Sequence, residues 1–190
     1  MKKIVNDQEY SFAPNANLKN ANLKNANLTH VDLSGANLHH ANLNHSFLFE
    51  ADLSGADLSK SDLTHSRLND ANLSGADLHE SKLKNALLKR AKMQNANLRG
   101  ADLRDADLVG ANLSNANLSG VVLGKADLSK ALLIGADLSG VDLRLARLSG
   151  ADLSGVKTDE HTKLPRGIDS TTSPKLWPII PKNPCICGLP

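Results

Sequence analysis

The sequence predicts an all-β solenoid whose chain winds in a square coil, and three observations carry this prediction. Leu recurs at every fifth residue from Leu18 to Leu153, at 27 of 28 positions, and Met93 is the exception. The residue two before each Leu is always small, and is Ala 21 times. The residue two after each Leu is Gly ten times and Asn five times. Gly and Asn tolerate turn and left-handed backbone conformations.

A period of five excludes the two regular single elements. In an α-helix five residues advance by about 500°, so successive Leu side chains would spiral around the helix and form no stripe. In a straight strand an odd period sends successive Leu side chains to opposite faces. A short extended piece followed by a corner lets Leu and the small residue two before it share one interior.

Four such corners close a circuit of 20 residues, and stacked circuits pair their backbones about 4.8 Å apart, as strands do. The repeats cover residues 16–155 and make about seven coils. We number the four faces by their first central residues, which are Leu18, Leu23, Leu28 and Leu33. Leu145 is the residue that fits the corner position least well, because a corner favours Gly or Asn.

The tandem A-(D/N)-L-x-x units, clearest over residues 96–120, resemble the pentapeptide-repeat family. The resemblance implies a right-handed quadrilateral β-helix with the central Leu and the small residue inside. It also implies a non-enzymatic interaction module, a rigid rod that presents its faces to a protein partner. Two alternatives follow from other members: a DNA-mimic protein that protects or inhibits gyrase, and a bacterial effector delivered to a host cell. Many members have Phe at some central positions, whereas this chain has none there.

Both ends of the chain lack the repeat. Residues 1–15 hold two short apolar pieces around a polar turn, and we interpret them as a strand or hairpin that caps the first coil. Residues 156–190 form a Pro-rich tail in which a long helix is excluded, so the C-terminal helix with which the family's quinolone-resistance members dimerise is not expected. The apolar piece Leu176–Ile180 could dock on the rod, but the entropy of ordering the linker favours a loose end beyond about Ser170. The roles of Cys185 and Cys187 and the oligomeric state stay open.

On two faces the outward residues differ from the short polar residues that the repeat usually places there. The candidate partner surface is on the third face, where apolar side chains point outward and can mark a binding site; its residues are Phe47, Phe49, Arg67 and Leu87. The second face carries a weak basic column, made of Lys24, Lys84, Arg104 and Arg144. His45 and His65 are 20 residues apart and are expected to stack. Two imidazoles are fewer than the three or four ligands that a metal site needs, so we expect no metal and no other cofactor.

Charge and composition exclude several function classes. Residues 16–155 contain 15 Lys or Arg and 15 Asp or Glu. A rod without net charge argues against DNA mimicry, and the basic column is too sparse for nucleic-acid binding. Ser, His and Asp recur because the repeat recurs, so they indicate no catalytic triad and we expect no enzyme activity. Without a recognisable export signal or membrane span, and with two Cys, a cytoplasmic location is expected.

Overall fold

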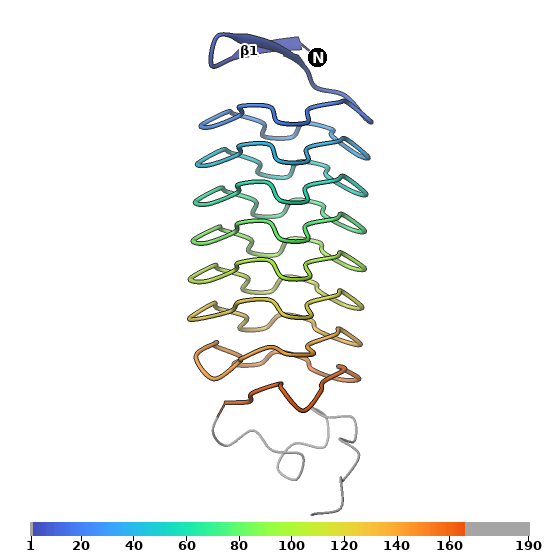
Figure 1. Cartoon of the computed structure of the whole chain (residues 1–190), viewed down its shortest axis with the longest axis vertical. Coiled ribbons are helices and arrows are strands. Elements are labelled where there is room, and N and C mark those ends of the chain that lie inside the picture. Colours follow the sequence, from blue (N-terminus) through green and yellow to red (C-terminus); the bar gives the residue numbers. More distant parts are fainter. Residues whose placement is uncertain (1, 166–190) are drawn as a thin grey trace, which may run out of the picture.

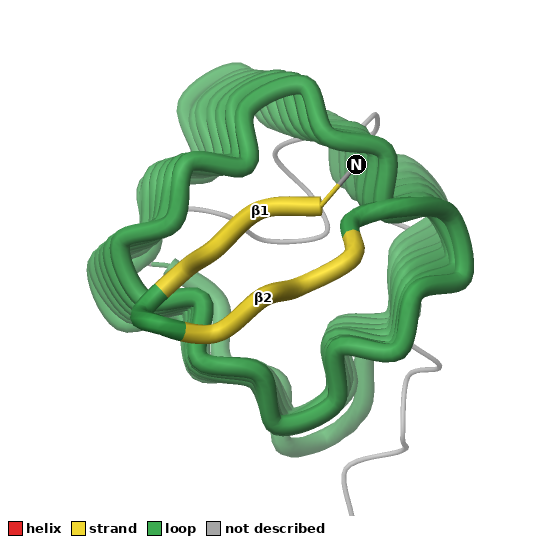
Figure 2. The backbone as a smooth tube through the Cα atoms, turned by 90° about the horizontal axis from the view of Figure 1, so that it is seen from above, coloured by secondary structure: helices red, strands yellow, loops and turns green. Residues whose placement is uncertain are grey.

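The chain forms a rod of stacked square coils. The computed structural model describes residues 2–165, and Figure 1 shows the coils following one another along the long axis. Seen along that axis, the coils superpose into a four-sided outline (Figure 2). The fold is the quadrilateral β-helix that the five-residue period predicts.

The N-terminal end of the rod is covered by an antiparallel hairpin. Strand β1 (Lys2–Val5) pairs with strand β2 (Gln8–Ser11), and the hairpin lies across the opening of the first coil (Figure 2). Tyr10 and Phe12 are buried and extend the hydrophobic core beyond the first coil, toward the N-terminal end of the rod. The Tyr10 hydroxyl accepts a hydrogen bond of 3.0 Å from the backbone N–H of Asn22. The hairpin therefore supplies both apolar cover and a backbone partner to the first coil.

Each face of a coil pairs in parallel with the same face of the next coil. The bridges join residues 20 apart, as between Asn37 and Asp57. Three backbone hydrogen bonds accompany a bridge: between coils two and three the N–H of Leu38 donates to Asp57 O (2.7 Å), that of His40 to Ser59 O (3.1 Å), and that of Asp57 to Ala36 O (2.9 Å). The extended pieces are too short to be strands, so sheet-like pairing is carried by isolated bridges.

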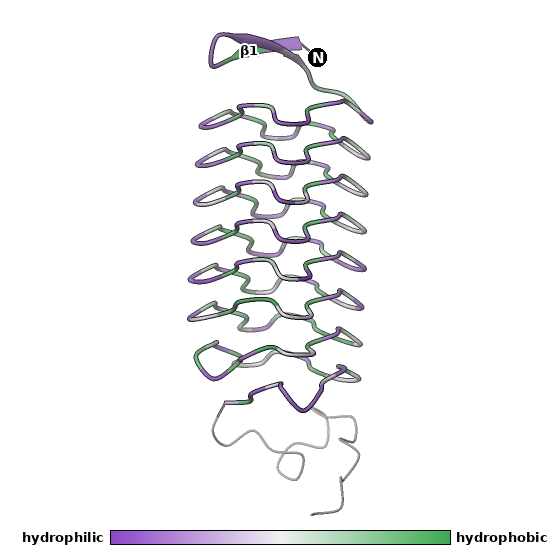
Figure 3. Ribbon diagram, viewed as in Figure 1, coloured by the Kyte–Doolittle hydropathy of each residue, from purple (hydrophilic) through white to green (hydrophobic). Residues whose placement is uncertain are grey.

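The interior is a ladder of Leu side chains with Ala beside them. Every central residue from Leu18 to Leu143 is buried, Met93 included, whereas Leu148 in the last full coil is half-buried. Figure 3 shows hydrophobic and hydrophilic residues alternating along each coil. The alternation reflects the orientation of the side chains: Leu points into the rod, and the residues before and after it point to the surface.

The corners take the left-handed conformation that the sequence predicts. Of the 28 residues at the corner position, 27 have a positive φ, and the exception is Leu145. The predicted poor fit of Leu145 is thus confirmed. A Leu side chain in the left-handed region is disfavoured sterically, and the backbone there takes another path.

The outward Asn and Asp residues that precede many of the central Leu residues have a structural role. Their Oδ1 atoms accept the backbone N–H two residues later, as Asp32 does from Ser34 (3.0 Å) and Asp127 from Ser129 (2.9 Å). These local bonds satisfy N–H groups at the turn.

The ladder continues past Gly155 into an eighth coil. Asp137 pairs with Lys157, and Asp142 pairs with Lys163, which is 21 residues later. The extra residue lies in the loop that precedes Lys163, where Asp159 accepts a hydrogen bond of 2.8 Å from the N–H of Gly140. The described chain therefore ends on the second face.

Candidate functional site

The third face brings three of the predicted partner-surface residues into one column. Parallel bridges join Phe47 to Arg67 and Arg67 to Leu87, so these residues occupy coils two, three and four. Phe49 follows Leu48 and lies beside Phe47 in the same coil. We call Phe47, Phe49, Arg67 and Leu87 the third-face patch.

The side chains of the patch contact one another. The Arg67 guanidinium carbon lies 5.0 Å from the centroid of the Phe47 ring, which is within the range of a cation–π interaction. The rings of Phe47 and Phe49 are 6.4 Å apart and inclined by 36°. Both Phe residues are half-buried, whereas Arg67 and Leu87 are exposed. The expected outward orientation is present, but the stacking of Arg67 on Phe47 reduces the exposed aromatic area.

Two His side chains extend the third-face patch around the corner toward the second face. The rings of His45 and His65 are 4.7 Å apart and nearly parallel, at 6°, which confirms the predicted stack. Together with Phe47, Arg67 and Leu87 they line a shallow groove of about 430 Å³. Within residues 2–165, no three His, Cys, Asp or Glu side chains gather as metal ligands.

The basic column of the second face is not a continuous positive stripe. Arg104 donates from Nε to Asp102 Oδ1 at 2.8 Å, and Arg144 donates from Nε to Asp142 Oδ1 at 2.9 Å. The Arg144 hydrogen bond lowers the pKa of the Asp142 carboxyl to about 2. No salt bridge within residues 2–165 includes Lys24 or Lys84, and these two residues lie in coils one and four, with two coils between them. Two of the four charges are therefore already paired, and the column offers little to a phosphate backbone.

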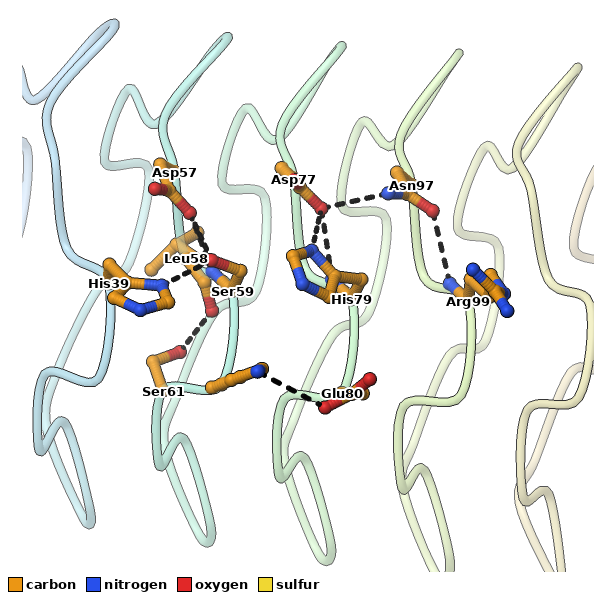
Figure 4. A network of polar contacts seen from close by, with 11 residues as sticks. His39, Asp57, Leu58, Ser59, Ser61, Asp77, His79, Glu80, Asn97 and Arg99 are labelled. Carbon is orange, nitrogen blue, oxygen red and sulfur yellow. Dashed lines mark hydrogen bonds and ion pairs between the residues drawn. The ribbon is translucent and has the colours of Figure 1, made fainter.

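The first face carries a polar network that the sequence analysis did not single out (Figure 4). Ser59 is 3% exposed, donates from Oγ to Asp57 Oδ1 at 2.5 Å, and lies 2.6 Å from His39 Nδ1. One coil further, Asp77 contacts His79 Nδ1 (2.9 Å) and accepts from Asn97 Nδ2 (2.9 Å). The spacing of 20 residues between His39, Ser59 and His79 could have located this column from the sequence.

The geometry at Ser59 differs from that of an activated nucleophile. Partial burial raises the pKa of Asp57, but hydrogen bonds from Ser59 and the nearby His39 and His79 outweigh it, so the pKa is lowered. The ionised carboxylate can only accept, so it takes the single hydroxyl proton of Ser59. The Ser59 oxygen then accepts a hydrogen bond from His39. A general base must instead take the proton of the nucleophile, and this network is therefore a structural one.

Comparison with known proteins identifies the family. A family model described as pentapeptide repeats matches in eight copies, over residues 15–48, 48–85, 81–120 and 122–157. This chain belongs to the pentapeptide-repeat family. A comparison with curated protein sequences gave no match.

Solved structures of pentapeptide-repeat proteins resemble this chain. HetL, which is involved in the regulation of heterocyst differentiation in the cyanobacterium Nostoc sp. strain PCC 7120, is 33% identical. That match covers 76% of this chain and 75% of HetL, with a TM-score of 0.50. A trypsin-treated form of QnrB1, a plasmid-mediated fluoroquinolone resistance protein, is 23% identical with a TM-score of 0.51, over 72% of this chain and 79% of QnrB1. At that identity QnrB1 is similar in fold only.

A third similar structure comes from the thylakoid lumen of Arabidopsis thaliana. It is 37% identical over 47% of this chain and 63% of the lumenal protein, with a TM-score of 0.47. In the part of this chain that the structure describes, no helix has the length and apolar character needed to cross a membrane.

Proposed function

We propose that this pentapeptide-repeat rod is a non-enzymatic interaction module that binds a protein partner through the third-face patch. The observation that carries the proposal is the groove where Phe47, Arg67 and Leu87 meet the stacked His45 and His65. Aromatic residues and Arg are enriched in the centres of protein interfaces. Many other outward positions hold short polar side chains that bond to their own turns, as Asp32 does to Ser34.

The chemistry of the patch indicates what it would accept. Phe47, Phe49 and Leu87 present apolar area, and the Arg67 guanidinium is exposed above the Phe47 ring. Guanidinium groups pair well with carboxylates. The preferred partner surface therefore combines an apolar side chain with an adjacent Asp or Glu.

A DNA-mimic role at gyrase, the alternative suggested by the family and by the fold of QnrB1, receives less support. Mimicry of duplex DNA needs a dense array of unneutralised negative charge. Here several outward carboxylates are paired, as Asp70 is with Arg90 (2.6 Å) and Asp107 with Lys89 (3.2 Å). HetL takes part in regulation, which is compatible with a binding role. The effector role and the cytoplasmic location stay predictions, and cell fractionation would test the location.

Affinity capture tests the proposal with a matched pair of variants. Phe47→Ser with Phe49→Ser removes the two apolar residues that flank Leu48, and we expect it to abolish capture of the partner. Leu132→Ser with Ile134→Ser removes the exposed apolar residues that flank Leu133 on the fourth face, and capture should persist. Equal capture by both double variants would contradict the assignment of the interface to the third face.

A further inference from the structure

The backbone ladder is interrupted at one place in the described chain, on the second face between coils six and seven. Bridges join residues 20 apart from Asn17–Asn37 through Asp137–Lys157, and the bridge between Val122 and Asp142 is the one missing from this series. The three backbone hydrogen bonds that accompany such a bridge are absent as well. Within residues 2–165, the N–H groups of Leu123, Lys125 and Asp142 have no backbone partner on the facing coil. We call this interruption, between residues 122–125 and 142–145, the open seam.

Residues of the two coils explain the opening. Val121 and Val141 lie 20 residues apart, and each occupies the inward position that is usually Ala. Both are buried, so two β-branched side chains are stacked where the coil accommodates a methyl group, and overpacking of this kind displaces backbone. Leu145 adds a second cause, since it does not adopt the left-handed corner. The seam is thus built into the sequence.

A groove lies over the open seam. It has a volume of about 310 Å³, and residues lining it include Gly120, Gly124, Val122 and Leu145. Val122 and Leu145 are 47% and 67% exposed. Gly120 and Gly124 place no side chain over the seam. Apolar walls together with unpaired backbone N–H and C=O groups are the features that bind an extended peptide along a sheet edge.

We propose that this groove binds the chain's own segment Leu176–Ile180, which lies outside the described residues. The described chain ends on the second face, which carries the open seam. Lys163 pairs with Asp142, so the chain leaves the rod on the same face as the open seam and one coil beyond it. A segment that follows is therefore delivered beside the groove.

The intervening chain is long enough to reach the groove. The segment between Pro165 and Leu176 can span about 30 Å when extended, whereas the seam lies roughly two coil spacings, about 10 Å, from Lys163. The entropy of closing a loop grows only with the logarithm of its length. Binding of the segment therefore does not require every linker residue to be fixed, so the full entropy cost that favoured a loose end is not incurred.

The segment is also chemically suited to the groove. Leu176–Ile180 is the strongly apolar piece of the tail, and it contains Trp177, the single Trp of the chain. Pro178 and Pro181 restrict φ to values compatible with an extended path. The N–H and C=O groups of the other residues can pair with the seam, and the large Trp177 ring can cover Val122 and Leu145.

Fluorescence of Trp177 in the full chain tests the proposal. We expect the wild-type emission to lie at shorter wavelength than that of the unfolded protein, with a several-fold smaller quenching constant for acrylamide. Val122→Ser with Leu145→Ser should restore a solvent-like spectrum and quenching. The matched control Leu132→Ser with Ile134→Ser, on the fourth face, should keep the wild-type values. A solvent-like wild-type spectrum, or equal loss in both double variants, would overturn the proposal.

Hydrogen exchange shows where the segment binds, independently of the Trp177 fluorescence. In Trp177→Ser the amides of Leu123, Lys125 and Asp142 should exchange several-fold faster than in the wild type, while amides of Leu118 and Leu138 on the first face should not change. Unchanged exchange at all of them would overturn the groove assignment. Protection of Trp177 that disappears on dilution would show that the occupant is the tail of a second copy, and would overturn binding within one chain.

Discussion

Replacing Leu58 by Ala tests the core that the repeat predicts. Leu58 lies between Leu38 and Leu78 in the first-face column, and all three are 0% exposed. The substitution removes three carbon atoms, worth about 2.4 kcal/mol at about 0.8 kcal/mol per buried methylene. The cavity adds to this loss, because backbones stacked about 4.8 Å apart cannot close on it. We expect a loss of about 3–4 kcal/mol in the free energy of unfolding.

Leu73→Ala provides an internal comparison. The next residue in its column is Met93, which is equally buried and flexible enough to fill part of the space. We therefore expect Leu73→Ala to cost about 1 kcal/mol less than Leu58→Ala, since the cost depends on how far the site can collapse.

Urea denaturation and thermal unfolding of both variants measure these costs. For a chain of this size a loss of 3 kcal/mol corresponds to a fall in Tm of roughly 6–12 °C. A Leu58→Ala protein within about 0.5 kcal/mol of wild type would refute the interior Leu ladder, since ordinary surface changes fall in that range. A cost for Leu73→Ala at least as large as that for Leu58→Ala would refute the role given to Met93.

Three further predictions concern charge, corners and the alternative function. In Arg144→Gln the pKa of Asp142 should rise from about 2 toward 3.8, as measured by NMR titration. In the wild type the lowered pKa means that the ionised Asp142 carboxylate stabilises the fold above pH 3.8. This contribution to stability is lost as the pH falls toward 2. Gly135→Ala should destabilise more than Gly75→Ala in urea, since a Cβ at Gly135 would lie 2.5 Å from Asn115 Oδ1 whereas nothing lies within 4 Å of one at Gly75. We expect a cost of about 1 kcal/mol for Gly75→Ala and a somewhat larger cost for Gly135→Ala, because the Asn115 amide must turn away. In a gyrase supercoiling assay with a quinolone the protein should give no protection, and protection at micromolar protein would contradict the charge argument.

Much of the fold could be predicted because one repeat unit determines it. The five-residue period excludes helix and straight strand, and the spacing of 20 residues then places side chains in columns. That spacing is sufficient to predict the stack of His45 on His65. It also identifies Leu145 as the residue that does not fit its corner.

Contacts that depend on side-chain rotamers could not be predicted in this way. The spacing places Arg67 next to Phe47, but it does not show that the guanidinium lies over the ring. Nor does it show that Asp102 and Asp142 turn toward the Arg residues two positions later and neutralise half of the basic column. Those outcomes depend on local geometry that a repeat pattern does not specify.

The open seam depends on the side-chain volume of two inward residues that stack on each other, Val121 and Val141. Val121 or Val141 alone would be an ordinary variant of a small inward residue. Val31 shows this, because it has no Val in the next coil and the ladder beside it is intact. The N–H of Asp52 donates to the carbonyl of Val31 at 3.0 Å. Two Val residues one above the other exceed the space of two methyl groups, and Leu145 avoids the left-handed corner beside them. The bonds between coils six and seven are lost on the second face, while the other three faces stay bridged. In a solenoid each coil contacts only its neighbours, so the disturbance stays local and the coils on either side remain paired. A rod of this kind can therefore open one face at a single level, where bulky inward residues 20 apart coincide with a corner residue that avoids the left-handed conformation.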